Sequence, residues 1–174
     1  SFPEKNAQNL LIELVSANPT GPLSVAHGRQ AAVGDVLAGI LRFLGYKVTR
    51  EYYLNDEGNQ INILGKSIAL RLKELQGEKI DFPEDHYQGE YIIDLAKELL
   101  QSSAVSWPEG RGWASDSPSH CQLSADSCKE YGVKRILEII RKELEDFGVR
   151  FDSWYSQAVL QKSGKIEQVI ADLR

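Results

Sequence analysis

Residues 10–28 read LLIELVSANPTGPLSVAHG, and this stretch decides the fold. Its opening residues form an apolar run that predicts a buried strand, and the turn-forming residues after them close it. Apolar residues from 33 to 44 recur on one face of a predicted helix, and Gly45 stands where helices commonly end. Residues 47–53 mix β-branched and aromatic side chains with polar ones, which is typical of a strand. Strand, helix and strand in succession predict a βαβ unit with parallel strands.

The middle of the chain predicts helices. Apolar residues keep helical spacing over residues 61–75 and again over residues 90–100. Residues 102–128 are rich in Ser, Gly and Pro and show no apolar period, so we interpret them as a loop or surface linker. A third helix is predicted from residue 133 to Phe147.

The end of the chain predicts a return to the sheet. Residues 149–155 indicate a strand, and a final helix begins at Gly164. We expect its apolar residues to face inward, namely Ile166, Val169, Ile170 and Leu173.

The predicted fold class is therefore α/β, a partial Rossmann-like parallel sheet with a helical insertion. Residues 1–56 would form the first βαβ unit, residues 57–147 the insertion, and residues 148–174 the return to the sheet with a final helix.

Composition narrows the class of protein. The chain has 174 residues, which is enough for one domain with a core, and 42% hydrophobic with 26% charged residues is ordinary for a soluble protein. No apolar run is long enough to span a bilayer and no signal segment opens the chain, so we expect a cytoplasmic protein without a membrane contact. The net charge of −5 argues against a protein surface that binds nucleic acid through its overall positive charge.

The two cysteines do not suggest a metal site. Cys121 and Cys128 match no zinc-binding spacing, and so few thiols favour a reducing compartment over a disulfide framework. We predict free thiols and no metal held by protein side chains.

Chemistry is expected at the junction between the first strand and the first helix. Unpaired backbone N–H groups and the positive end of the helix dipole favour phosphate there, and ligands of open α/β sheets lie at this edge. The junction has neither a phosphate-binding Gly-Lys-Ser/Thr loop nor a Gly-x-Gly-x-x-Gly pattern. Taken alone, His27 could simply hydrogen-bond its neighbours, and residues 18–22 could be only a rigid turn.

Longer segments carry a specific resemblance. The string from Ser16 to Arg29, followed by residues 31–37, closely resembles the signature of bacterial arginyl-tRNA synthetases, which are class I aminoacyl-tRNA synthetases. The resemblance includes nearly the whole chain outside residues 102–128, and corresponds to the N-terminal half of the catalytic domain. Its other segments are residues 45–53, 55–60, 87–91, 151–156 and 163–165.

The resemblance implies an arginine–tRNA ligase. This family joins ATP and arginine into arginyl-adenylate and pyrophosphate, and then transfers the arginyl group to tRNA. It implies arginine, ATP and tRNA as partners, magnesium accompanying the ATP, and a monomer at full length. Reactions of this kind depend mainly on positioning and on stabilising phosphate charge.

The signature motif maps to residues from Ala17 to His27. The family has His-Ile/Val-Gly-His at the helix start, where this chain has Ser24-Val25-Ala26-His27. The resemblance implies that His27, with Ser24 in place of the first histidine, acts on the triphosphate. Loss of one transition-state donor typically costs about 100- to 1000-fold in rate. The implied ATP-binding residues are Pro19, Thr20, Gly21, Ser24, Ala26, His27 and Gly28.

The resemblance also implies an arginine site made by Glu13, Ser16 and Asn18. A carboxylate can pair with a cationic substrate group, and an amide can orient it by hydrogen bonds. The alternative for Glu13 is an ordinary strand carboxylate that faces solvent.

Several departures from the family shape the functional hypotheses. The chain lacks a second triphosphate-binding loop, the later catalytic strands and the tRNA-binding domains, so we expect these residues alone to be an inactive fragment of the ligase. The alternative is a degenerate, non-catalytic nucleotide- or arginine-binding module. An unrelated nucleotidyltransferase ranks last because it would not explain residues 52–58. Residues 102–128 also depart from the family, and a slip of the reading frame is one hypothesis for them.

Overall fold

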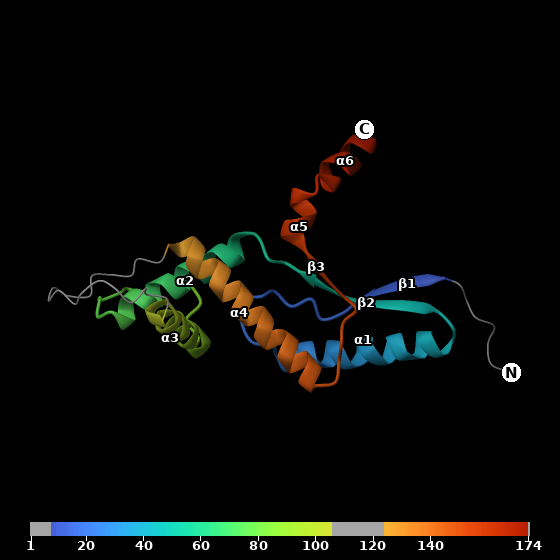
Figure 1. Cartoon of the computed structure of the whole chain (residues 1–174), viewed down its shortest axis with the longest axis horizontal. Helices are drawn as coiled ribbons and strands as arrows, with labels where there is room; N and C mark the ends of the chain where they lie inside the picture. The colour runs from blue at the N-terminus through green and yellow to red at the C-terminus, as the bar shows by residue number, and fades with distance from the viewer. Residues whose placement is uncertain (1–7, 106–123, 174) are drawn as a thin grey trace. The chain divides into compact units, whose positions relative to one another are not determined.

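Three parallel strands form the sheet in the part of the chain that the computed structural model describes, residues 8–105 and 124–173 (Figure 1). Strand β1 (Asn9–Glu13) pairs with β2 (Lys47–Leu54), and β2 pairs with β3 (Ser153–Ser156). The parallel pairing confirms the predicted α/β class with a partial Rossmann-like sheet. Strand β3 begins later than predicted, because residues 149–152 precede the paired segment.

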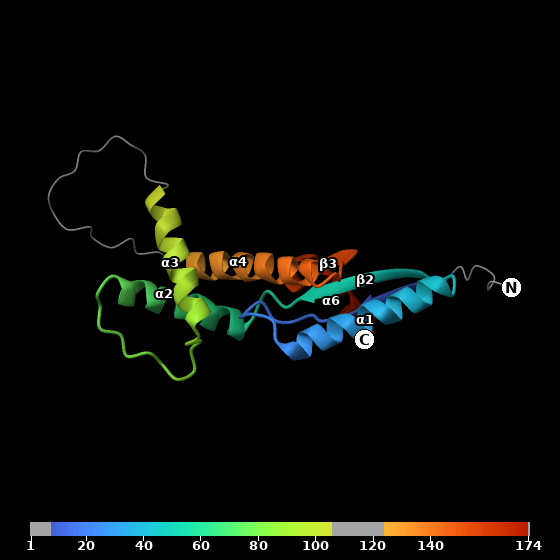
Figure 2. The ribbon, with the colours of Figure 1, turned by 90° about the horizontal axis from the view of Figure 1, so that it is seen from below.

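Helix α1 (Val25–Phe43) makes the crossover from β1 to β2 and runs alongside both strands (Figure 2). Because α1 connects two neighbouring parallel strands, it holds its N-terminus at the carboxyl edge of the sheet. The other described helices are α2 (Asn59–Leu75), α3 (Glu90–Val105), α4 (Ala125–Asp146), α5 (Gln157–Lys162) and α6 (Lys165–Asp172). Within residues 8–105 and 124–173, no helix has the length and apolarity to cross a membrane.

The chain divides into two compact units. One comprises residues up to Glu57 and from Leu137 onward, and the other runs from Gly58 to Ile136. The first therefore contains the sheet, α1 and the C-terminal helices. In the second, α3 crosses α2 (Figure 2), and both helices contribute buried apolar residues. Its fully buried side chains include Leu64, Ile68 and Ile92.

Aromatic rings form the core beside the sheet. Tyr52 of β2 is fully buried and stacks on Trp154 of β3, with ring centroids 4.4 Å apart. Phe151 meets Tyr52 edge-on at 5.3 Å, and the guanidinium of Arg141 lies 4.2 Å from the centroid of the Trp154 ring. Such ring contacts stabilise beyond the area that they bury. They hold the returning strand β3 against β2.

The boundaries of the predicted loop at 102–128 are wrong at both ends. Helix α3 continues to Val105, and α4 already begins at Ala125. Cys128 lies buried in α4 and forms no disulfide, in agreement with the prediction that the cysteines do not make a disulfide framework. Residues 106–123, with Cys121 among them, lie outside the described residues. A Ser-rich composition hid these helix ends because polar helix positions leave no apolar period.

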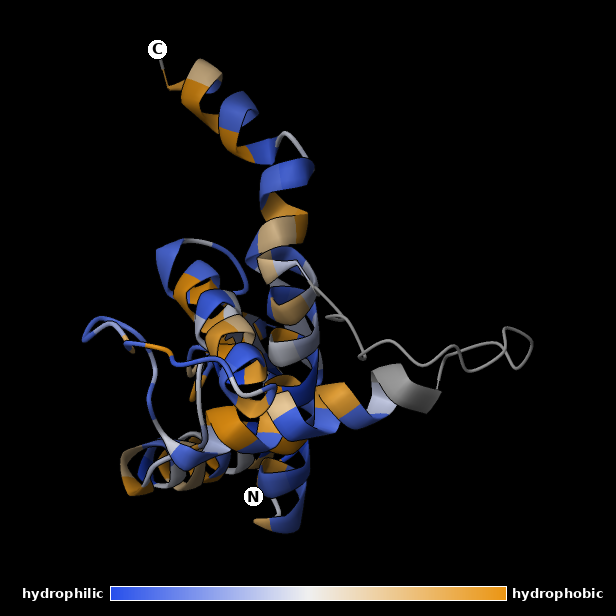
Figure 3. Cartoon of the chain, turned by 90° about the vertical axis from the view of Figure 1, so that its left-hand side faces the viewer, coloured by the Kyte–Doolittle hydropathy of each residue, from blue (hydrophilic) through white to orange (hydrophobic). Residues whose placement is uncertain are grey.

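The inward face predicted for the final helix is also wrong. Helix α6 has no buried residue, and Leu173 beyond it is 82% exposed. Figure 3 shows hydrophobic stretches along the two C-terminal helices. The short helix α5, which precedes α6, was not predicted. Its six residues are too few to show a helical period.

Most of the large apolar residues of α1 are likewise exposed. Val33 is 64% exposed and Val36 is 61% exposed, whereas Ala31, Gly34 and Ala38 are buried. The small residues of α1 therefore pack against the rest of its unit. The predicted stripe of large apolar residues lies on a different part of the helix surface. Apolar periodicity identifies a face but not whether another element covers it.

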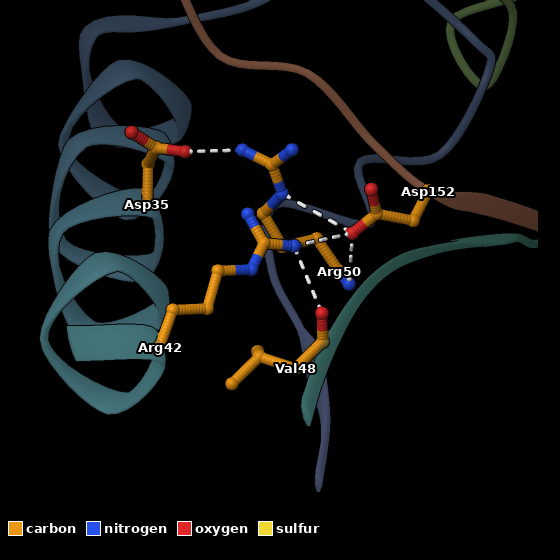
Figure 4. Close-up of polar contacts among 5 residues, drawn as sticks. All are labelled: Asp35, Arg42, Val48, Arg50 and Asp152. Atoms are coloured by element: carbon orange, nitrogen blue, oxygen red, sulfur yellow. Dashed lines mark hydrogen bonds and ion pairs between the residues drawn. The ribbon is translucent and has the colours of Figure 1, made fainter. Parts of the chain in front are cut away.

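A charged network fastens α1 to the sheet (Figure 4). One carboxylate oxygen of Asp152, Oδ2, accepts hydrogen bonds from Arg42 Nη2 at 2.8 Å, from the Arg50 backbone N–H at 2.8 Å and from Arg50 Nε at 3.3 Å. Arg50 Nη1 also donates to Asp35 of α1 at 2.7 Å. Burial by itself would raise the pKa of Asp152, but the hydrogen bonds from Arg50 and the charges of Arg50 and Arg42 outweigh it and lower that pKa.

Substitution of Gly34 tests the close approach of α1 to the strand. A Cβ added at Gly34 would lie 2.7 Å from Leu14 Cβ, so we expect Gly34→Ala to lower the free energy of unfolding by about 1–3 kcal/mol. Gly39→Ala is the matched control, because nothing lies within 4 Å of its added Cβ. There the better helix former should raise stability by up to about 1 kcal/mol. Urea unfolding of both variants measures these free energies. Equal changes for the two variants would contradict the close packing of Gly34 against Leu14.

Replacement of Asp152 tests the charged network. We expect Asp152→Asn to lower the free energy of unfolding by about 1 kcal/mol at neutral pH, a modest figure because the side chain is 40% exposed. The lowered pKa means that the carboxylate stabilises the fold above its unfolded-state pKa, and that this contribution is lost as pH falls through the folded-state pKa. The difference between wild type and variant should therefore close below about pH 4.

The control for this pH dependence is Asp172→Asn. It removes the same charge from a carboxylate that has no ion pair within the described residues. Urea unfolding at several pH values should show no closing difference for this variant. A difference for Asp152→Asn that persists unchanged into acid would contradict the role of the ion pairs.

Candidate functional site

The backbone leaves β1 through a strained turn. Val15 has φ 67° and Ser16 has φ 41°, both in the left-handed region that side chains with a Cβ rarely adopt. A β-branched residue such as valine is particularly unfavourable there. Strain of this kind persists only where surrounding contacts determine it, and it gathers at ligand sites. The turn therefore marks the end of β1 as the candidate site.

The end of β2 holds this turn through three hydrogen bonds. The Tyr53 backbone N–H donates to Ser16 Oγ at 3.0 Å, and the Tyr52 hydroxyl donates to the Ala17 carbonyl at 2.9 Å. Just beyond the strand, Asn55 Nδ2 donates to Asn18 Oδ1 at 3.1 Å. Parallel pairing brings the carboxyl ends of both strands to one edge, which explains why these donors reach the turn.

The tyrosines and Asn55 were not among the predicted site residues. They lie in segments that carried the family resemblance, and this was the signal that could have identified them. Burial raises the pKa of the Tyr52 phenol, against a smaller opposite effect of its hydrogen bond to Ala17. The hydroxyl therefore stays protonated and keeps donating at physiological pH.

The tip of α1 brings Ser24 and His27 together. Ser24 is the N-cap in an extended conformation, with φ −106° and ψ 167°. Its backbone N–H donates to His27 Nδ1 at 3.0 Å, and its Oγ lies 3.2 Å from the same nitrogen. Because a backbone N–H can only donate, Nδ1 must be the unprotonated acceptor, and a neutral ring carries its proton on Nε2. The half-buried His27 thus serves as a helix cap, and Nε2–H remains a donor available to a ligand.

The other predicted ATP-binding residues surround this tip. Pro19 is fully buried, whereas Ala26 is exposed. Thr20 and Gly21 are half-buried in the loop before the helix. Gly28 follows His27, and its N–H donates to the Ser24 carbonyl at 3.1 Å as the helix begins.

A cavity of about 570 Å³ lies beside the end of β1. Residues 12–16 form one wall, with the predicted arginine-binding residues Glu13 and Ser16 among them. The other wall belongs to α1 and comprises Arg29, Gln30, Val33, Gly34 and Leu37.

Several of the predicted site residues do not line this cavity. Asn18 and the helix tip with Ser24 and His27 are not part of its lining. Glu13 is exposed on its strand, in agreement with either the ligand or the solvent interpretation.

The fold is shared with solved structures of tRNA synthetases. The structure of arginyl-tRNA synthetase from Thermus thermophilus superposes with a TM-score of 0.59 over 98% of this chain and 27% of that one. At 22% identity this similarity concerns the fold alone. A crystal structure from Campylobacter jejuni, described as an arginyl tRNA synthetase, superposes with a TM-score of 0.73 at 39% identity, over 90% of this chain and 32% of that one.

The family follows from the sequence match. The model described as "tRNA synthetases class I (R), catalytic domain" matches residues 2–153, so the chain belongs to this family. It is 44% identical to an arginine–tRNA ligase of Lawsonia intracellularis and 47% identical to one of Syntrophotalea carbinolica. Both alignments include 97% of this chain and 29% of the relative, so the chain spans less than a third of the curated relatives it matches.

Removal of the Tyr52 hydroxyl tests the support of the turn. Tyr52→Phe leaves the carbonyl of buried Ala17 without this donor, so we expect a loss of about 1–2 kcal/mol in the free energy of unfolding. Tyr53→Phe is the matched control, because the Tyr53 hydroxyl has no hydrogen bond among the described residues. It should change stability by no more than about 0.5 kcal/mol. Urea unfolding measures both, and similar losses would contradict the assignment.

Proposed function

We propose that this chain is the ATP- and arginine-binding front part of an arginine–tRNA ligase catalytic domain. One observation carries the proposal: the tip of α1 stands at the carboxyl edge of the sheet with the Nε2–H of His27 available to a ligand. This is where an open α/β sheet binds phosphates. The family membership makes the triphosphate of ATP the natural ligand.

In the proposed reaction, the carboxylate of arginine attacks the α-phosphorus of ATP, and pyrophosphate leaves. His27 would donate from Nε2 to a phosphate oxygen, and the N–H groups at the start of α1 would add partial positive charge. Glu13 and Ser16 line the cavity that would hold arginine, with Asn18 nearby in the turn. Pro19, Thr20, Gly21, Ala26 and Gly28 would shape the surroundings of the nucleotide.

Ser24 weakens this arrangement. Its hydroxyl is shorter than an imidazole and cannot become cationic, and here it lies against His27 Nδ1. We therefore expect the isolated chain to bind its ligands and not to complete the reaction. The same Ser24–His27 contact favours the second candidate function, a non-catalytic nucleotide- or arginine-binding module of the same fold.

We also propose magnesium and tRNA as partners. Magnesium would arrive with ATP and be held mainly by the phosphates, as this cation prefers. Among the described residues, no group of three His, Cys, Asp or Glu side chains is placed to hold a metal ion. We propose tRNA as the final acceptor, a monomer as the full-length state, and the cytoplasm as the compartment.

Two variants of the helix tip test the proposal. Titration calorimetry should detect ATP with magnesium binding to the chain. His27→Gln should weaken this binding by roughly tenfold, because a donor to a charged phosphate is lost. Ser24→His combined with Ala26→Gly should strengthen it. Binding of ATP that none of these changes affects would contradict the assignment of the tip.

Catalysis is measured separately as arginine-dependent exchange between ATP and pyrophosphate. We expect exchange at background for the chain and for its Ser24→His, Ala26→Gly form alike, because the chain spans less than a third of the relatives that it matches. Exchange above background by the chain would contradict this expectation.

A further inference from the structure

The cavity beside β1 contains a cation that the predicted site does not use. Arg29 on α1 lines it together with Glu13 on β1. Within residues 8–105 and 124–173, neither side chain has a hydrogen bond or an ion pair. By contrast, Arg42 and Arg50 of the same unit are bound by Asp152. A carboxylate and a guanidinium without partners therefore line facing walls of one cavity. Together they could bind a ligand that carries both a positive and a negative charge.

The rest of the cavity strengthens this interpretation. Glu13 and Arg29 are the charged residues in a lining that is otherwise largely apolar, so a charged ligand would pair with them. The apolar side chains are Ile12, Leu14, Val15, Val33 and Leu37.

The position of Arg29 on α1 places its charge near the start of the helix. Helical side chains lean toward the N-terminus and lie over the preceding turn. Ala26 is three residues before Arg29, on the same side of α1. Arg29 therefore lies within the first turns of α1, close to the tip that holds Ser24 and His27. Glu13 lies on the opposite wall, at the end of its strand.

We propose that Arg29 binds the α-carboxylate of the amino acid while Glu13 takes its cationic side chain. This inference rests on the proposed function and adds a positioning residue to it. A guanidinium matches a carboxylate with two parallel hydrogen bonds. It also repels the guanidinium of arginine, so the substrate enters in one orientation. In that orientation the carboxylate that attacks ATP faces the tip of α1.

A comparison of two ligands tests the assignment. L-arginine and agmatine share the guanidinium, but agmatine lacks the carboxylate. Titration calorimetry on the chain should show that Arg29→Gln weakens L-arginine binding by roughly 10- to 100-fold and does not weaken agmatine binding. Arg29→Lys should restore part of the affinity for L-arginine, because it keeps the charge and loses the fork geometry.

Arg150→Gln is the matched control. It removes the same charge from an exposed residue of the same unit that does not line the cavity. We expect both ligands to bind this variant as they bind the wild type. Circular dichroism of each variant verifies that the fold is retained.

The outcomes separate the inference from the proposed function. If L-arginine binds the wild-type chain and Arg29→Gln weakens both ligands equally, or neither, Arg29 does not bind the carboxylate and the proposed function stands. If the wild-type chain binds neither L-arginine nor agmatine, both the inference and the arginine site of the proposed function are overturned.

Discussion

The backbone leaves β1 in a left-handed conformation at Val15 and Ser16, and the end of β2 holds it there. Each such residue costs of order 1–3 kcal/mol, which surrounding contacts must offset. The hydrogen bonds from Tyr52 and Tyr53 do so at the one place where both parallel strands end. This constraint determines where the loop runs and where α1 begins. The position of the helix tip, and with it the candidate nucleotide site, depends on it.

A second set of contacts holds α1 further along its length. Asp152 connects the arginines of α1 and β2 immediately before the returning strand β3, so one carboxylate links helix and sheet. Gly34 lets the same helix approach Leu14 closely. Because these contacts act on the body of α1, its tip is placed by a rigid element and not by a loop alone. Rigid elements place functional groups more accurately than loops do.

His27 illustrates how one residue can have a structural and a chemical use together. The backbone N–H of Ser24 occupies Nδ1, which leaves Nε2 for a ligand. A hydrogen bond on one ring nitrogen commonly sets the proton on the other in this way. The structural and functional hypotheses for His27 are therefore compatible. Family membership is shown by the match over residues 2–153, whereas the effect of Ser24 in place of a histidine is a matter for the binding and exchange measurements.

The sequence by itself determined the strand–helix–strand order, the parallel α/β class and the family, because periodicity and local motifs are properties of neighbouring residues. It did not determine the helix ends at Val105 and Ala125, the short helix α5, or the exposure of Leu173 and of the large side chains on α1. Only the tertiary structure decided that Asn55 and the two tyrosines support the turn after β1, and that Glu13 and Arg29 share a cavity. These are contacts between segments far apart in the chain, and no local pattern records which residues folding will bring together.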